Sequence, residues 1–225
     1  ELDQGAWIIA VTKDAVLPTI NSKSPVIDAL KTKGLNPEML RTIYLDANTH
    51  TWGEFLDLPN QDKINVYTRS DACGAAEMWA RYLGKNQEGL HGIGVFGDPG
   101  MADAVKNDKH GIGYNNVAYS YDMTTRKKYP GLEVVPVDLN KNGIIDPEES
   151  FYGTLDEIMN AIQTGKYPSP PARDLYFVSN GKPANPVAIA FLEWILTDGQ
   201  QFVSEAGYVK LTDEKIKNEL GKLGE

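Results

Sequence analysis

Two stretches of the sequence hold residues whose types and spacing suit the binding of ions. The first is Arg69–Ala75 (RSDACGA), which we call the Arg69 turn. It places one arginine and one aspartate before a run of small residues, and small side chains let a ligand approach the backbone closely. A strand pattern (NVYT) precedes the turn and a helix pattern (AAEMWARYL) follows it. The first N–H groups of that helix would point at the ligand, so the turn favours an anion site.

Each charged side chain of the Arg69 turn has a predicted role. The guanidinium of Arg69 suits a tetrahedral oxyanion, and Asp71 would either hold that guanidinium in place or cap the helix. An ordinary strand-to-helix connection, with Asp71 as the N-cap and Arg69 on the surface, fits the spacing equally well. The residues alone leave both interpretations open.

The second stretch is Asp138–Glu149 (DLNKNGIIDPEE), which we call the Asp138 loop. It matches a calcium-binding loop at every required position, because oxygen ligands alternate around a sharp turn that Gly143 permits. The predicted ligands are Asp138, Asn140, Asn142, the carbonyl of Ile144, Asp146 through a water molecule, and Glu149. The preceding LEVVPV is typical of a strand and not of a helix, so we expect a structural calcium ion and not a calcium switch. A merely polar loop is the alternative.

Catalytic chemistry finds little support in the sequence. His50, His91 and His110 lie in separate loops, and no Ser-His-Asp set is evident. Cys73 stands at a helix start, where thiol pKa values fall, so a covalent enzyme is an open alternative, although no histidine is near it in sequence. The glycine-rich segment 92–113 contains no complete nucleotide-binding motif, and we expect no organic cofactor.

Composition limits the remaining classes. The chain has 225 residues, of which 41% are apolar and 24% charged, as in a globular protein with one large domain or two lobes. The formal net charge of −9 argues against a nucleic-acid surface. The single cysteine excludes an internal disulfide, and no apolar run reaches the roughly 20 residues of a membrane span.

Strand and helix patterns alternate along the chain and predict an α/β fold. The expected strands are 6–11, 63–68, 111–122, 132–140 and 175–178. The expected helices are one from residue 37, then 75–83, 101–106, 153–164 and 186–196, and a charged helix from residue 213. Pro18 and Pro25 predict that the first strand ends before them, and three prolines before 175–178 indicate a rigid crossing between lobes.

Four segments resemble the phosphate-binding proteins that serve ABC importers. TRSDACGAAEMWARYLG is similar to that family's Arg-Ser-Asp-Gly-Ser-Gly-Thr turn, and GIGYNNVAYS to its Gly-Ile-Gly-Tyr segment. Thr51-Trp52 resembles its Thr-Trp turn, and FLEWILTDGQQFVSEAGYVKL its C-terminal helix. The resemblance covers nearly the whole chain. It implies a type II periplasmic binding fold, in which two α/β lobes close over phosphate, and it favours the anion interpretation of the Arg69 turn.

The resemblance also implies roles for individual residues. Arg69 would be the cationic ligand and Asp71 its salt-bridge partner. The implied phosphate-binding set is Arg69, Ser70, Asp71, Ala72, Cys73, Gly74 and Ala75. Cys73 and Ala75 stand where the family has hydroxyl side chains, so Arg69 and backbone donors would carry the site.

The family's N-terminal segment supplies further phosphate-binding loops and a carboxylate that accepts the ligand's proton, and it has no match here. One lobe is therefore expected to be incomplete. Residues 8–172 would form the lobe with the anion-binding turn and the calcium loop. Residues 173–225 would form the C-terminal part of the other lobe, with a crossing strand and helices.

The function that the resemblance implies is capture of inorganic phosphate outside the cytoplasm and delivery to the membrane permease of an ABC importer, without catalysis. The alternatives are a phosphate-sensing or scaffold protein with the same fold, and a thiol-dependent enzyme at Cys73. The expected location is periplasmic or extracellular, with any lipid anchor in a segment outside this chain. An uncovered sheet edge in the incomplete lobe would favour a homodimer.

Overall fold

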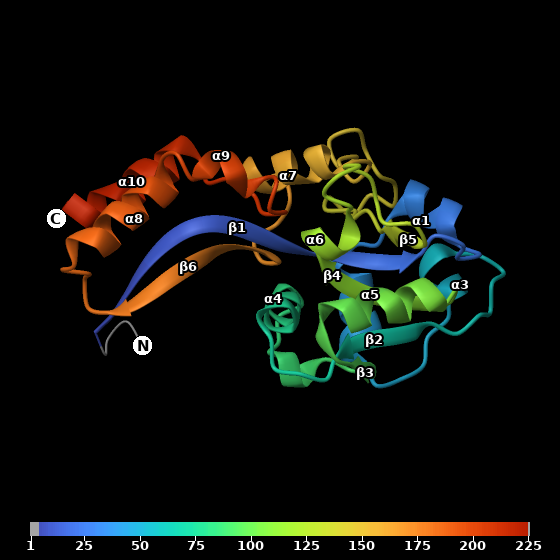
Figure 1. The fold of residues 1–225 in the computed structure, drawn as a ribbon. Helices are drawn as coiled ribbons and strands as arrows, with labels where there is room; N and C mark the ends of the chain where they lie inside the picture. The colour runs from blue at the N-terminus through green and yellow to red at the C-terminus, as the bar shows by residue number, and fades with distance from the viewer. Residues whose placement is uncertain (1–4, 225) are drawn as a thin grey trace.

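The computed structural model describes residues 5–224 and confirms an α/β architecture (Figure 1). The elements in chain order are β1 (Ala6–Asn21), α1 (Ile27–Lys33), α2 (Pro37–Leu45), α3 (Trp52–Leu56), β2 (Asn65–Arg69), α4 (Gly74–Tyr82), η2 (Gln87–Gly89), β3 (Ile93–Val95), α5 (Gly97–Asn107), β4 (Gly111–Asn116), α6 (Val117–Ser120), β5 (Leu132–Val134), α7 (Leu155–Gln163), β6 (Ala172–Asn180), α8 (Pro186–Leu196), α9 (Gln200–Val203) and α10 (Asp213–Gly224). No helix in this described part has the length and apolar character needed to cross a bilayer.

The main sheet has the strand order β3-β2-β4-β1-β5. Strand β2 runs parallel to both β3 and β4, whereas β1 is antiparallel to β4 and β5. The carboxyl ends of β2, β3 and β4 therefore lie at the same edge of the sheet. In α/β sheets this is the edge at which ligands bind.

Strand β1 is longer than the sequence predicted, because Pro18 does not end it. Pro18 lies opposite Tyr114 of β4, and its carbonyl accepts a hydrogen bond from Val135 N (2.9 Å). The N and C=O of one strand residue point to the same side, so the nitrogen of Pro18 faces β5. Strand β5 ends at Val134, so the missing N–H costs no regular strand pairing there.

Four other predicted elements have different bounds. The segment expected as a strand over 111–122 is β4 followed by the one-turn helix α6, because Tyr121 N bonds to Val117 O (3.0 Å). Only residues 132–134 of the strand expected over 132–140 form β5, and beyond them Val137 makes an isolated bridge to Leu35. Strand β6 begins at Ala172, immediately after the prolines, and helix α5 begins at Gly97.

Two cores cover the two faces of the main sheet. Val16 and Ile20 of β1 belong to a core shared with helices α1 to α5, whereas Ala15 and Leu17 belong to a second core with α6 and α7. Successive residues of a strand point to opposite faces, so β1 supplies both cores by alternation. The helices thereby hold the carboxyl ends of the parallel strands in fixed positions.

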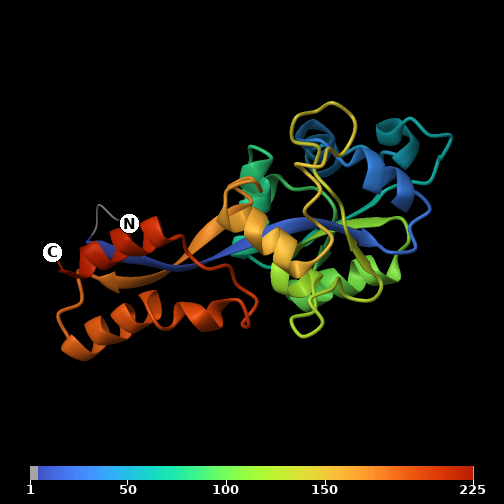
Figure 2. The ribbon, with the colours of Figure 1, turned by 90° about the horizontal axis from the view of Figure 1, so that it is seen from above.

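A two-stranded ribbon of β1 and β6 extends away from the main sheet (Figure 1). Helices α8, α9 and α10 lie along one face of this ribbon (Figures 1 and 2). Their shared core contains Ile9 and Ala10 of β1, Leu192, Leu196, Leu211 and Leu223. The expected division at 172/173 thus falls at the start of β6, but the beginning of β1 packs with the C-terminal part and not with the first lobe.

Apolar side chains remain exposed on the ribbon and on α8. They are Tyr176, Phe177, Val178, Val187, Phe191 and Trp194. Phe191 stacks on Trp194 with ring centroids 6.4 Å apart, and Trp194 stacks on Phe202 at 6.2 Å. The stack of Phe191, Trp194 and Phe202 is contiguous, and contiguous exposed apolar surface marks an interaction site.

Candidate functional site

The Arg69 turn lies at the carboxyl edge of the parallel strands. Strand β2 ends at Arg69, and α4 begins at Gly74 with Cys73 as its N-cap in an extended conformation (φ −153°, ψ 154°). Ala72 and Gly74 are exposed, whereas Ala75 is buried against the core. The small residues therefore have two roles. Some leave the backbone accessible, and Ala75 lets the first turn of α4 pack closely on the sheet.

The guanidinium of Arg69 is buried and held by two carboxylates. Its Nε and Nη2 donate to Asp71 Oδ1 (2.8 Å) and Oδ2 (2.6 Å), and its Nη1 donates to Asp98 Oδ1 (2.5 Å). The Arg69 side chain is only 6% exposed. The interpretation with Arg69 on the surface and Asp71 as the N-cap of the following helix is therefore wrong.

Asp71 holds both Arg69 and the start of α5 in place. Besides pairing with Arg69, its Oδ1 accepts a hydrogen bond from Gly97 N (3.1 Å), the first residue of α5. These donors hold the pKa of the Asp71 carboxyl well below its usual range, with the Arg69 hydrogen bonds as the main cause. The same pairing raises the pKa of Arg69 further above its ordinary value. Asp71 thus caps α5 and not α4.

Gln87 orders the segment between Asp71 and the helix. Its side-chain amide donates to the carbonyl of Asp71 (2.7 Å), and its Oε1 accepts from Cys73 N (3.1 Å). The Cys73 Sγ accepts from Ala76 N (3.4 Å), so the thiol takes the capping position that a hydroxyl takes more strongly elsewhere. The backbone N–H of Cys73 is therefore already engaged, which removes one of the expected anion donors.

Two backbone donors remain at the start of α4. Within residues 5–224, the hydrogen bonds leave Gly74 N and Ala75 N without an acceptor. They lie at the positive end of the helix dipole, which favours a negatively charged ligand. Ser70, by contrast, is exposed and donates its N–H to Val95 O (2.9 Å).

A second arginine, which sequence reasoning missed, lies next to Gly74. A Cβ placed on Gly74 would lie 3.2 Å from Arg173 Cζ and 3.5 Å from its Nη2, so the guanidinium lies against one side of this glycine. The Nε of Arg173 is buried without a hydrogen-bond partner among the described residues. Arg173 therefore has an unused donor at the N-terminus of α4.

Arg173 is oriented by Asp14 on the neighbouring strand. The two residues are direct partners in the β1/β6 register, with Arg173 Nη2 3.5 Å from Asp14 Oδ2. Burial raises the pKa of the Asp14 carboxyl to about 6, although the charge of Arg173 opposes the shift. Local sequence patterns carry no signal for this pair, because the register of strands far apart in the chain is not visible in them.

The charges around the Arg69 turn do not sum to a strongly positive site. Arg69 has one positive charge between two carboxylates, and Asp98 was not anticipated as its second partner. Three of the five guanidinium N–H groups are engaged by Asp71 and Asp98. An anion there depends on the free N–H groups of α4 and on Arg173 as much as on Arg69.

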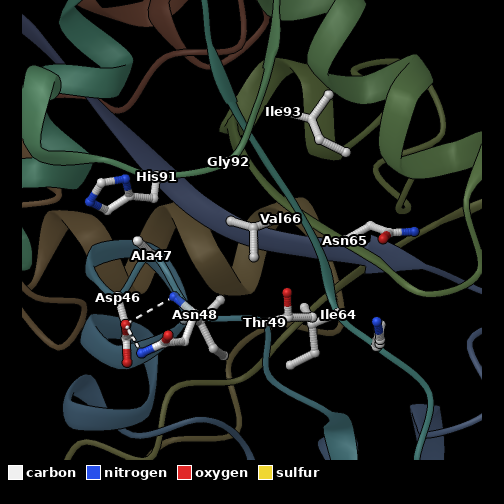
Figure 3. Close-up of a pocket in the computed structure, with 12 residues that line it drawn as sticks. Asp46, Ala47, Asn48, Thr49, Ile64, Asn65, Val66, His91, Gly92 and Ile93 are labelled. Carbon is white, nitrogen blue, oxygen red and sulfur yellow. Dashed lines mark hydrogen bonds between the residues drawn. The ribbon is translucent and has the colours of Figure 1, made fainter.

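The structure has one pocket beside Arg173 and another at the far end of β2. A pocket of about 450 Å³ is lined by Arg173, Met78, Arg81 and six other residues, beside the outer face of α4. A pocket of about 320 Å³ lies at the opposite, amino-terminal end of β2 (Figure 3). There Asn48 donates to Asp46 Oδ1 (2.7 Å) in a loop remote from the Arg69 turn. The second pocket is not the candidate anion site.

The Asp138 loop brings the predicted calcium ligands into one turn. Asp138 Oδ2 accepts from Gly143 N (2.9 Å), and Glu149 Oε1 accepts from Leu139 N (2.8 Å). Among the described residues, no three Asp, Glu, His or Cys side chains converge closely enough to hold a metal by themselves. The predicted set differs from such a cluster because it relies on two asparagines and a backbone carbonyl.

Comparison with known proteins identifies the family. The model of the PBP superfamily domain matches residues 1–199. The chain belongs to this superfamily. Its curated relatives include the phosphate-binding protein PstS of Haemophilus influenzae, 26% identical over 237 residues, with 89% of this chain and 67% of the relative covered. PstS of Staphylococcus aureus (strain USA300) is 22% identical over 215 residues, with 95% of this chain and 58% of the relative covered.

Solved structures show the same fold. A possible phosphate-binding protein from Planctomyces limnophilus has a TM-score of 0.67 at 17% identity, with 99% of this chain and 73% of that chain covered. A putative phosphate ABC transporter substrate-binding protein from Clostridium perfringens, solved with bound phosphate, has a TM-score of 0.66 at 20% identity, with 92% and 73% covered. The chain thus has the predicted periplasmic-binding fold, and it spans 58% of the length of the staphylococcal relatives.

Proposed function

We propose that this chain is the phosphate-capturing part of an extracytoplasmic binding protein that delivers inorganic phosphate to the membrane permease of an ABC importer. The observation that carries the proposal is the start of α4, where Gly74 N and Ala75 N are free near the buried Arg69 and the half-buried Arg173. Main-chain donors and guanidinium groups are the partners that a tetrahedral oxyanion takes in proteins. The PstS relatives are phosphate-binding proteins, which supports the same ligand class.

The proposed role is binding and not catalysis. Cys73 uses its Sγ as a helix cap, and none of the three histidines hydrogen-bonds to it within residues 5–224. Binding would act through closure of two lobes joined by β1 and β6, which presents a closed surface to the permease. The exposed aromatic stack of Phe191, Trp194 and Phe202 supports the further expectation that another surface covers it, and we propose a second copy as its partner when this chain is alone.

The experiment is a calorimetric titration of the 225-residue chain with phosphate, with sulfate as the control anion. It is repeated on a longer protein made by adding the N-terminal segment of a PstS relative to this chain. Binding of phosphate by the chain alone means that the start of α4 and the two arginines are a sufficient site. Binding only by the longer protein means that this chain supplies one side of a shared site. If neither form binds phosphate, the proposed function is wrong.

The matched variants for this titration are Arg69→Lys and Lys85→Arg. Lysine at position 69 cannot make the forked contacts to Asp71 and Asp98, so we expect at least tenfold weaker phosphate binding. Lys85 is exposed and outside the turn, so its substitution tests for nonspecific effects of exchanging basic residues. Retained affinity in Arg69→Lys would contradict the role assigned to Arg69.

A further inference from the structure

We propose that the Asp138 loop binds one calcium ion, which fastens the long connection between β5 and α7. This inference is independent of phosphate binding. The connection runs from residue 135 to residue 154 without a helix or strand. Loops of this length in compact domains need internal order from some source. The Asp138 loop has the ligand types and the spacing that a bound cation needs, so a cation could hold this connection in one conformation.

Burial of charge is the first argument. Asp138 is 1% exposed and Glu149 is 5% exposed. Within residues 5–224, no lysine or arginine nitrogen lies within the 4.0 Å of an ion pair from either carboxylate. The lysine inside the loop, Lys141, instead turns outward and pairs with Glu38 (2.5 Å). Buried carboxylates are costly unless hydrogen bonds, a cationic group or a metal ion compensates them. Here backbone N–H groups are the partners of both carboxylates, and a metal ion would supply the positive charge that no described side chain provides.

The path of the backbone around Asp138 is the second argument. Asp138 Oδ1 accepts from Lys141 N (2.7 Å) and Oδ2 from Gly143 N (2.9 Å), so the chain wraps around this carboxylate. Gly143 has φ +84°, and a Cβ there would meet nothing within 4 Å. Its glycine is therefore required by the backbone angle and not by space. This is the sharp turn that a twelve-residue calcium loop makes at its sixth position.

The far end of the loop closes back onto its beginning. Glu149 Oε1 accepts from Leu139 N (2.8 Å) and from Asn140 N (3.1 Å), so the last predicted ligand lies against the backbone that directly follows the first, Asp138. The amides of Asn140 and Asn142 both donate to Asp146 Oδ2, at 2.7 and 2.8 Å. Three of the predicted ligands, Asn140, Asn142 and Asp146, thus have their side chains next to one another. Within the described residues, these two neutral amides donate the side-chain hydrogen bonds that Asp146 accepts. A bound cation would interact with this carboxylate more strongly than a neutral amide does.

The loop is also tied to the core, which makes its order matter for stability. Ile145 N donates to Thr32 O (2.8 Å), and the Ile145 side chain packs over Gly34 at the end of α1. Ile144, whose carbonyl is the predicted ligand, keeps its side chain exposed. No helix enters the loop, so calcium would stabilise this connection and not drive a helix rearrangement.

The test uses the 225-residue chain stripped of metal with a chelator and then dialysed. Calorimetric titration with calcium chloride should show one site per chain, with weaker binding of magnesium, because Mg²⁺ demands stricter octahedral geometry. At a hundredfold excess of calcium over its Kd, the Tm should rise by about 5 to 10 °C. Absence of both the binding heat and the Tm shift would overturn the proposal.

Matched variants separate a built site from nonspecific attraction to acidic residues. Glu149→Gln should weaken calcium binding at least tenfold, whereas Glu148→Gln removes the same charge from an exposed neighbour and should leave affinity within about twofold. Equal losses in the two variants would refute the assigned ligand. If Glu149→Gln does not fold, Asp146→Asn provides the second test, because Asp146 is less buried. Backbone amide chemical shifts of Leu139 and Gly143 must also move on calcium addition and not on magnesium addition at equal concentration.

Discussion

Replacement of Gly74 by alanine should separate Arg173 from the start of α4 without removing its charge. A Cβ at this position would come within 3.2 Å of Arg173 Cζ and closer still to Nη1. The far end of a flexible side chain gives way more easily than backbone, so we expect the guanidinium to move and α4 to stay. The helix itself gains from the exchange, because alanine is favoured over glycine by up to about 1 kcal/mol.

The size of the effect follows from the contact that is lost. A hydrogen bond to a charged group contributes about 1.5 to 3 kcal/mol, and each 1.4 kcal/mol changes affinity tenfold. Gly74→Ala should therefore weaken phosphate binding by roughly 10-fold to 100-fold. The assay is calorimetric titration in whichever form of the protein binds phosphate. Gly100→Ala is the matched control, because its Cβ would meet nothing within 4 Å in the first turns of α5. It should bind phosphate as the parent does.

A double-mutant cycle tests the cause. If the added methyl group acts by displacing Arg173, then Gly74→Ala should cost little affinity once Arg173→Gln is present. If it blocks the anion directly, the loss should be the same in both backgrounds. That second result, or an unchanged affinity in Gly74→Ala alone, would refute the role given to Arg173.

Three further outcomes are expected. Cys73→Ser should bind phosphate as well as or better than the parent, because a hydroxyl caps α4 more strongly than a thiol, and loss of binding on this exchange would revive thiol chemistry. Burial raises the pKa of the Asp14 carboxyl from 3.8 to about 6. The free energy of unfolding should therefore fall by on the order of 3 kcal/mol as pH rises from about 4 to about 6, because the buried carboxyl must then ionise. Urea unfolding at several pH values should show Asp14→Asn gaining stability relative to the parent across that window, and parallel curves would contradict it. Sedimentation of the chain alone should show self-association that Phe191→Ser with Trp194→Ser reduces, whereas a monomer at all concentrations would exclude the homodimer.

The sequence predicted the position of charged residues correctly where that position follows from neighbouring residues in the chain. The strand, small-residue and helix patterns around Arg69 placed an arginine and an aspartate at a strand end but left open whether they pair. The family resemblance implied the pair, and the structure has Arg69 paired with Asp71. The same patterns could not show Asp98 as the second partner, because it comes from the start of α5. Its position depends on how two helices sit over the sheet, which is set by packing in the core and not by neighbouring residues.

Prolines gave the clearest local error. Pro18 was expected to end the first strand, since proline removes a donor and fixes φ. The cost of a proline in a strand depends on which neighbouring strand its missing N–H would have bonded. For Pro18 that neighbour is β5, which ends at Val134, so no strand hydrogen bond is lost there. Long-range pairing thus overrode a local preference. The same dependence on strand pairing hid the Asp14 and Arg173 partnership.

The position of Arg173 connects ligand binding to the crossing strands. Arg69 is buried and held between two carboxylates, so it contributes a rigid framework with little freedom to follow a ligand. Arg173 instead lies on β6, beside Asp14 on β1, in the ribbon that leads to the C-terminal helices (Figure 1). An anion held by α4 and by Arg173 would join the main sheet to this ribbon. The orientation of the C-terminal part would then depend on the ligand through that one side chain, and this is the coupling that a binding protein needs to report its occupancy to a partner.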